Sequence, residues 1–202
     1  MERIDLVELH YILPITNLRS ILEHGLLSNA RVATLPHHSV AAENIQGRRS
    51  TKTVPGGFPL HNYVNLYFHA RNPMLYLRKN IHTSLCVLRI SPAVLDLPNV
   101  IITSQNASSD YVRFYPSPDG LANLDKSMVF AESWIHADQI EEWQHKSIKC
   151  AEVLVPNQIN SVYIMGGYVS NQQTLQEIQQ LFIDSEMQFP VTISEHLFFL
   201  GA

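Results

Sequence analysis

The sequence predicts one α+β domain in which strands are interrupted by short helices. With 202 residues, of which 46% are hydrophobic and 16% charged, the chain is long enough for a single domain, 1–202, with a substantial core. Because helical patterns do not alternate regularly with the strands, an α+β architecture is favoured over a doubly wound parallel sheet. Apolar runs typical of strands lie at 6–12, 63–69, 84–90, 100–103, 150–155, 162–165 and 189–193.

Capping signals predict short helices between these strands. Thr16 or Asn17 can cap a first helix whose apolar residues recur at helical spacing, and Gly25 ends it. Pro55, Gly56 and Gly57 predict a turn. The other expected helices span 40–49, 119–126, 138–146 and a segment up to Phe182, with cap candidates at Ser39, Asp138 paired with Glu141, and Ser170 paired with Gln173.

Composition limits the classes of function. Cys86 and Cys150 lie in apolar, strand-like surroundings, which predicts reduced buried thiols and a cytoplasmic protein. The sequence has no apolar segment long enough to span a membrane, no signal-peptide pattern at its start and no metal-binding spacing, so we expect a soluble protein without a metal. A net charge of -4 is wrong for a protein that coats duplex DNA, so any nucleic-acid contact must be local.

One stretch, 44–76, concentrates two arginines, a Pro-Gly-Gly turn, a histidine and an aromatic run. Farther along the chain, Glu152 lies within the predicted buried strand CAEVLVP. A carboxylate in such a strand costs several kcal/mol unless something requires it there. Together these features indicate a site that binds a diphosphate and stabilises a positively charged carbon.

These segments resemble the DarT family of NAD-dependent DNA ADP-ribosyltransferase toxins. The likeness includes 45–76, the strand residues 151–155 and the opening segment ELHYILPITNLRSILEHGLL, 8–27, and it covers nearly the whole chain. The Arg-Arg, Pro-Gly-Gly and Tyr-Phe elements follow the family's order. The resemblance implies an ADP-ribosyltransferase-like split β-sheet with short flanking helices.

The resemblance further implies that Glu152 is the catalytic glutamate and that Arg49, in the Gln46–Arg49 motif, is the second catalytic residue. ADP-ribose transfer passes through a cation-like sugar, which a carboxylate stabilises. The planar arginine fork suits a diphosphate, so we expect Arg49 to bind NAD rather than to act as a base. From the residues alone, Glu152 could instead reach solvent or an internal arginine, and Arg48 and Arg49 could simply favour a helix C-terminus.

NAD is the implied co-substrate. Tyr67 matches the residue that stacks on nicotinamide, and an aromatic face suits a flat ring that becomes cationic. His10 and Tyr11 are adjacent on the first strand, so only one of them can face NAD. The resemblance also implies that His61, Arg71 and Met74 lie at the NAD site. Each has an alternative explanation: His61 as a hydrogen-bonded loop histidine, Arg71 as part of a surface ion pair, and Met74 as a core residue. The remaining implied NAD contacts are Asn17 and Gly25.

The acceptor side is assigned to the segment before the catalytic strand. Trp134 and His136 lie there, and an exposed tryptophan can stack on an unpaired base. Arg113 is expected to add a small basic patch. Trp143 is equally well explained by packing of an amphipathic helix.

The resulting hypothesis is transfer of ADP-ribose from NAD to a base of single-stranded DNA by the toxin of a toxin-antitoxin or phage-defence pair. Its partner would be an antitoxin that removes ADP-ribose, related to macrodomains. Guanine is favoured over thymine, because its exocyclic amine can attack while Glu152 takes the proton, and because 10–11 and 111–114 depart from thymine-modifying members. The alternatives are modification of protein or RNA, and a catalytically silent nucleic-acid-binding module. The presence of both Arg49 and Glu152 counts against silence.

Overall fold

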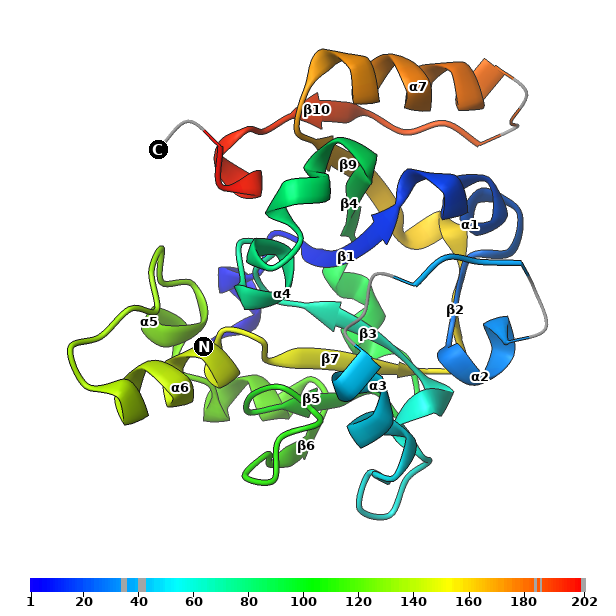
Figure 1. Ribbon diagram of the computed structural model, residues 1–202. Coiled ribbons are helices and arrows are strands. Elements are labelled where there is room, and N and C mark those ends of the chain that lie inside the picture. Colours follow the sequence, from blue (N-terminus) through cyan, green and yellow to red (C-terminus); the bar gives the residue numbers. More distant parts are fainter. Residues whose placement is uncertain (34–35, 40–42, 184, 186, 201–202) are drawn as a thin grey trace.

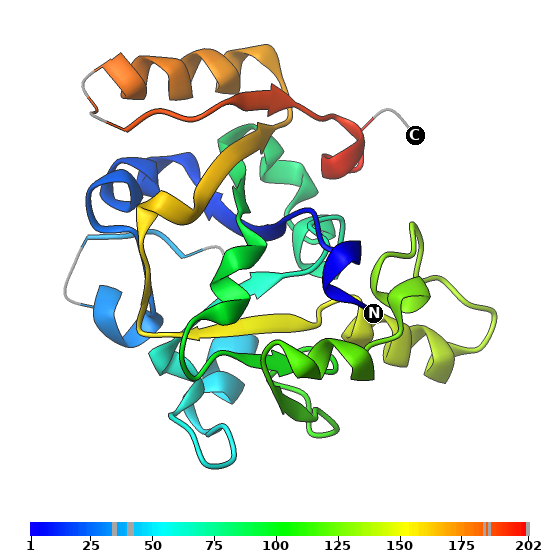
Figure 2. The same ribbon diagram turned by 180° about the vertical axis from the view of Figure 1, so that it is seen from behind.

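The computed structural model describes residues 1–202 except 34–35, 40–42, 184, 186 and 201–202. Its centre is a sheet with the strand order β10-β9-β4-β1-β3-β7-β5-β6, and β2 pairs with β8 beside it (Figures 1 and 2). The strands of the large sheet are β1 Leu9–Pro14, β3 Tyr63–Tyr67, β4 Leu85–Ile90, β5 Ile101–Thr103, β6 Phe114–Pro116, β7 Glu152–Pro156, β9 Ile164–Val169 and β10 Val191–Ile193. The small sheet consists of β2 Leu26–Leu27 and β8 Gln158–Ile159.

The large sheet is split between β1 and β3. These strands pair at one position, where His10 lies opposite Tyr67. By contrast, β1 pairs with β4 along its whole length, and β3 pairs with β7 from Tyr63 to Tyr67. The halves β10-β9-β4-β1 and β3-β7-β5-β6 therefore diverge from a single pair of residues, which confirms the expected split sheet.

Short helices surround the sheet. The α-helices are α1 Leu18–His24, α2 Asn29–Val32, α3 Glu43–Ser50, α4 Pro73–Tyr76, α5 Lys126–Val129, α6 Gln139–Ile148 and α7 Gln172–Ile183. The 3₁₀ helices are η1 Arg3–Asp5, η2 Ile15–Asn17, η3 Leu60–Asn62, η4 Lys79–Ser84, η5 Pro92–Asp96, η6 Asp119–Asn123, η7 Ser161–Tyr163 and η8 His196–Phe198. The predicted start of a helix at residue 40 lies outside the described residues.

One predicted helix and one predicted cap differ from the structure. The expected helix over 119–126 is divided into η6 and α5, because the Asp125 side chain accepts hydrogen bonds from Ser127 N and Met128 N and starts a new helix. At α7 the cap is Asn171, whose Oδ1 accepts from Thr174 N, rather than Ser170. Asp138 caps α6 as expected.

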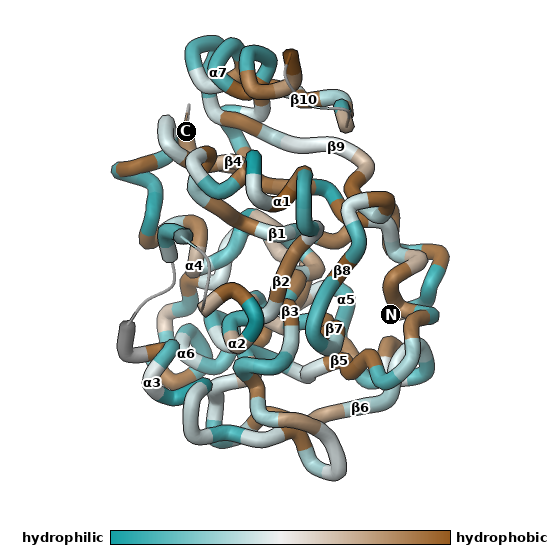
Figure 3. The backbone as a smooth tube through the Cα atoms, turned by 90° about the vertical axis from the view of Figure 1, so that its right-hand side faces the viewer, coloured by the Kyte–Doolittle hydropathy of each residue, from teal (hydrophilic) through white to brown (hydrophobic). Residues whose placement is uncertain are grey.

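Alternation along the strands produces two apolar layers. Leu9 and Leu13 of β1 join the larger core, whereas Ile12 joins a second cluster with Tyr67, Cys150 and other side chains. Both cysteines are buried and unpaired, as predicted. Hydrophobic residues follow β1 and β3 through the interior, and the outer turns of α7 are hydrophilic (Figure 3). In the described part of the chain, no helix has the length and apolar character needed to cross a membrane.

Gly25 is the clearest backbone requirement of the fold. It ends α1 at φ 74°, and a Cβ there would lie 2.3 Å from the carbonyl oxygen of Ile159. By contrast, Gly47 lies within α3, and no atom is within 4 Å of a Cβ placed on it.

We predict that Gly25→Ala lowers the free energy of unfolding by about 1–3 kcal/mol. The control Gly47→Ala should raise it by about 0.5–1 kcal/mol, because alanine is the better helix former. Urea denaturation of both variants measures the difference. Equal effects from the two substitutions would contradict this account of Gly25.

Candidate active site

A cavity of about 300 Å³ lies where β1 and β3 diverge. Its walls come from β1, α1, β2, α3, β3, α4 and residues 37–39, which are brought together from distant parts of the chain. A volume of this size lies within the range of small-molecule sites. The split of the sheet therefore creates a site for a ligand without breaking either half of the sheet.

A buried ion pair lies at this cavity. Arg49 Nη1 donates to both carboxylate oxygens of Glu152, at 3.2 Å and 2.8 Å. Arg49 lines the cavity and is 5% exposed, whereas Glu152 is 0% exposed. The backbone N–H of Ala107 also donates to Glu152 Oε1 at 3.0 Å. The two predicted catalytic residues are thus in direct contact, and Glu152 does reach an internal arginine.

The backbone around Glu152 is fixed by Thr103, at the end of β5. Glu152 N donates to Thr103 Oγ1 at 2.8 Å, and this hydroxyl donates to Gln105 O at 2.7 Å. These bonds hold both β7 and the turn that brings Ala107 to the carboxylate. The sequence analysis did not identify Thr103 or Ala107 as part of the site. The contact from Ala107 is made by its backbone, so its side chain carries no signal for it.

Three buried polar atoms at the cavity have no partner within the described chain: Gln46 Oε1, Arg49 Nη2 and His61 Nε2. An unsatisfied buried polar group costs about 1–3 kcal/mol. Burial and then the charge of Arg49 lower the pKa of His61, so its imidazole is neutral near pH 7. The cavity is therefore suited to a polar ligand that both donates and accepts hydrogen bonds.

Tyr11 and Tyr67, the two tyrosines expected to contact NAD, both line the cavity, together with Tyr63. Tyr67 lies on β3 opposite Glu152, and burial, followed by the Glu152 charge, raises its pKa well above the usual value. Burial also raises the pKa of Tyr11. Both phenols therefore stay protonated. Tyr11 lines the cavity but His10 does not. The Nε2 atom of the buried His10 lies 3.1 Å from Oε1 of the partly buried Glu8.

Asn17, Gly25 and Met74 also line the cavity, as expected from the resemblance. Asn17 occupies the N-cap position of α1, as predicted, but its side chain makes no capping hydrogen bond to the helix. Its amide instead bonds the backbone of His38 in both directions, with Nδ2 donating to the carbonyl at 2.7 Å and Oδ1 accepting from the N–H at 3.0 Å. Asn17 thereby holds the exposed segment that contains His37 and His38, which both line the cavity.

The other predicted site residues lie outside the cavity lining. Arg71 donates to the carbonyl of His196, lies 3.2 Å from a Glu132 carboxylate oxygen, and has its guanidinium 4.1 Å from the centre of the Phe199 ring. His136 Nε2 lies 2.7 Å from His145 Nδ1. Arg113 is exposed.

The expectation that Trp134 is exposed is wrong. Its exposed fraction is 7%, because its ring packs edge-to-face against Tyr76 and Phe199 at centroid distances of 5.8 Å and 6.0 Å. Neither partner is near it in the sequence, so local patterning could not reveal the contact. The exposed tryptophan of this region is Trp143 on α6.

Lys149 ties the segment before β7 to the residues that follow β3. Its buried Nζ lies 2.8 Å from His69 Nδ1 and donates to the carbonyls of Val129 and Ala131. Burial lowers the pKa of Lys149 to about 8. Burial and then the Lys149 charge lower the pKa of His69 to about 3, so His69 is neutral and can accept the bond.

A family model described as "ssDNA thymidine ADP-ribosyltransferase, DarT" matches residues 10–199. This chain belongs to the DarT family. Two relatives are a DNA ADP-ribosyl transferase–DNA ADP-ribosyl glycohydrolase fusion protein of Thermosipho africanus and a DNA ADP-ribosyl transferase of Thermus sp. strain 2.9. The first is 28% identical over 96% of this chain and 50% of the fusion protein; the second is 30% identical over 66% of this chain and 69% of that protein.

Solved DarT structures show the same fold. Thermus sp. 2.9 DarT in complex with ADP-ribosylated ssDNA has a TM-score of 0.83 and 27% identity, covering 96% of both chains. The same DarT in complex with NAD+ has a TM-score of 0.77 at 24% identity and supports the fold. The present chain spans about half the length of the Thermosipho fusion protein.

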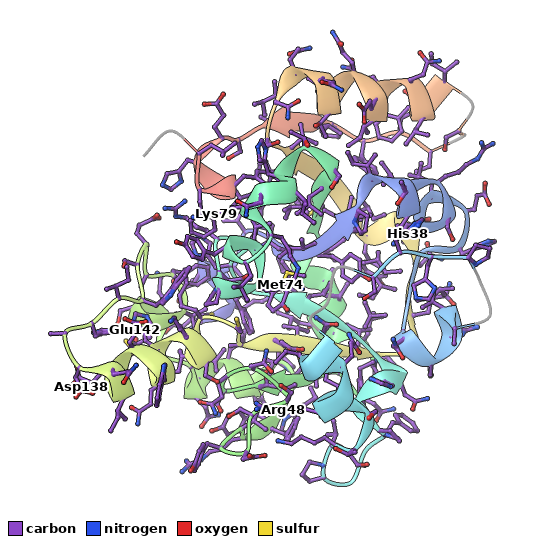
Figure 4. All side chains as sticks on the ribbon, viewed as in Figure 1. His38, Arg48, Met74, Lys79, Asp138 and Glu142 are labelled. Carbon is purple, nitrogen blue, oxygen red and sulfur yellow. The ribbon has the colours of Figure 1, made fainter. Side chains whose placement is uncertain are left out.

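The two arginines of α3 provide a matched test of the ion pair. Arg49→Ala leaves the Glu152 carboxylate buried without its cation, so we predict a loss of about 3–5 kcal/mol in the free energy of unfolding. Arg48 is exposed on the same helix (Figure 4), and Arg48→Ala should change stability by less than about 0.5 kcal/mol. Chemical denaturation measures both. Similar losses from the two variants would contradict the assigned register.

The His69–Lys149 contact predicts a pH dependence. The ordinary pKa of histidine is 6.5, whereas that of His69 is about 3. Between pH 6.5 and 5 the unfolded chain therefore takes up a proton that folded His69 does not, so stability falls as pH is lowered, by up to about 1.4 kcal/mol per pH unit. Denaturation at several pH values should show a smaller slope for His69→Gln. The control is His24→Gln, which replaces an exposed histidine; an equal change of slope in both variants would contradict the assignment to His69.

Proposed function

We propose that this protein transfers ADP-ribose from NAD to a base of single-stranded DNA. The observation that carries the proposal is the buried Arg49–Glu152 pair at a cavity with unsatisfied polar atoms, in a chain of the DarT family. A carboxylate held this rigidly suits stabilisation of a developing positive charge, because it needs little reorganisation during the reaction. The solved complex of Thermus sp. 2.9 DarT with ADP-ribosylated ssDNA supports the same reaction.

The residues present fit NAD. Arg49 Nη2 has donor capacity for a diphosphate, and Gln46 and His61 offer further polar atoms. Tyr67 and Tyr11 add flat apolar surface for nicotinamide and ribose, while Asn17, Gly25 and Met74 shape the cavity. NAD would supply the ADP-ribosyl group and a neutral leaving group, nicotinamide.

Arg49 contacts Glu152 in this structure, and that contact supports a binding role for Arg49. A diphosphate competes with Glu152 for the guanidinium, because both are anions that accept charge-assisted hydrogen bonds. Binding of the diphosphate at Arg49 Nη2 would therefore weaken the Arg49–Glu152 pair. The Glu152 carboxylate would then be available to interact with the ribose. Glu152 keeps its hydrogen bond from Ala107 N–H during this exchange. Arg49 binds and Glu152 stabilises.

The acceptor and the biological role complete the proposal. Guanine is the acceptor proposed from the sequence, and thymine is the alternative because the matched family description names thymidine. The glycohydrolase fused to the Thermosipho relative supports an antitoxin partner that removes ADP-ribose, and hence a toxin role. A cytoplasmic location follows from this role, because NAD and single-stranded DNA are found inside the cell.

Mass spectrometry of short oligonucleotides after incubation with NAD tests the reaction. A strand with guanine as its only candidate base should gain one ADP-ribose, and a thymine-only strand should not. Modification of the thymine strand alone would overturn the choice of base and leave the reaction standing. Modification of RNA or protein but not DNA would replace the substrate class, and no modification of any acceptor would overturn the proposed function.

Glu152→Gln tests the role of the carboxylate. The amide oxygen can still accept from Arg49 and Ala107, so the variant should fold, but it carries no negative charge. We predict a loss of about a hundredfold or more in turnover with little change in NAD affinity, because the charge acts on the transition state. Rate measurements and NAD titration separate the two quantities. Retention of more than about a tenth of the wild-type rate would remove Glu152 from its assigned role.

A further inference from the structure

A concentration of exposed apolar and cationic side chains adjoins the cavity at the end of α4. Tyr76, Leu77 and Ile81 are 41%, 69% and 45% exposed, and Lys79 is exposed between them. We call residues 76–81 the α4 patch. Leu77 and Arg78 of this patch also line the cavity, so the patch is continuous with its mouth. Exposed apolar surface of this kind beside a cavity is typical of a binding surface.

The Tyr76 ring is held in place by residues from two other parts of the chain. It packs edge-to-face against Trp134 at 5.8 Å and against Phe199 at 5.0 Å, with interplanar angles of 81° and 78°. Trp134 belongs to the segment before the catalytic strand and Phe199 follows η8. Because these contacts fix the ring orientation, Tyr76 forms a rigid aromatic platform beside the cavity.

Cations lie over the rings of this platform. Lys79 Nζ is 4.4 Å from the Tyr76 ring centroid and 3.3 Å from its hydroxyl oxygen. The Arg71 guanidinium lies over Phe199. Glu132, the acidic side chain of this cluster, lies within 3.2 Å of Arg71 and 3.3 Å of His196. In a chain of net charge -4, this region thus combines aromatic faces with positive charge.

We propose that the α4 patch binds the nucleotide next to the acceptor base in single-stranded DNA. Tyr76 stacks on the neighbouring base, and Lys79 moves from the ring to the adjacent phosphate. Sites for single-stranded nucleic acids commonly combine aromatic side chains, on which the bases stack, with cations that contact the phosphates. The α4 patch has both. A protein partner would not require cations stacked on the rings. The inference rests on the proposed function, because it uses the same acceptor and the same cavity.

Fluorescence anisotropy with a short labelled DNA strand, without NAD, tests this surface. Tyr76→Leu removes the ring and should weaken binding about fivefold or more, whereas Tyr76→Phe keeps the ring and should bind like the wild type. Lys79→Gln should lower the slope of log affinity against log salt by about 0.7, the value for one phosphate contact on a single strand. NAD titration and melting temperature of each variant report on the cavity and the fold.

Trp143→Leu is the matched control. Trp143 is 59% exposed on α6. In Figure 4, Glu142 of this helix and its N-cap residue Asp138 lie away from Lys79 and Met74. This variant should bind DNA like the wild type. The proposal for the α4 patch would be overturned if Tyr76→Leu and Lys79→Gln both bound DNA with wild-type affinity, or if Trp143→Leu lost as much affinity as they do. In either case, DNA modification by the wild-type protein would leave the proposed function standing. A wild-type protein that neither binds nor modifies DNA would overturn both.

Discussion

The buried ion pair between Arg49 and Glu152 sets the conditions that the surrounding structure must meet. Removing two charges from water costs several kcal/mol for each ion, and only good geometry with further hydrogen bonds offsets it. The fold supplies that geometry through Ala107 N–H and the Thr103 hydroxyl. The pair also holds α3, which has Ile45 as its one apolar side chain and therefore cannot dock on the sheet by hydrophobic packing alone.

The position of the site follows from the way the sheet divides. A single residue pair joins β1 to β3, so the two halves separate immediately beyond His10 and Tyr67. The register then places Tyr67 opposite Glu152, at the point where the strands diverge. A cavity is thereby opened next to the buried Arg49–Glu152 pair. This arrangement suits transition-state stabilisation, which depends on groups that are already in place before the reaction.

The distribution of charge in this acidic protein is compatible with the proposed single-stranded DNA substrate. With a net charge of -4, the chain has no general attraction for a polyanion. Cations are instead held locally, by Phe199 under Arg71 and by Tyr76 under Lys79. Because rings orient these cations beside the cavity mouth, recognition can depend on a few unpaired nucleotides rather than on a long stretch of backbone.

The sequence by itself determined the family, the buried position of Glu152 and the approximate place of every strand of the large sheet except β6, because alternation and motif order are local properties of the chain; it missed β6 and the short strands β2 and β8. It also limited the first strand to one NAD-facing residue without choosing between His10 and Tyr11. The tertiary structure places Tyr11 and not His10 at the cavity, since His10 is held by Glu8.

Long-range packing also decided which aromatic residues are exposed. Trp134 is buried because Tyr76 and Phe199 pack against it from distant segments. The Glu152 carboxylate accepts a hydrogen bond from the backbone N–H of Ala107, and a backbone contact cannot be predicted from the type of side chain. Periodicity fixes the face on which a residue lies. Its neighbours across that face depend on how distant segments pair and pack, and only the folded chain contains that information.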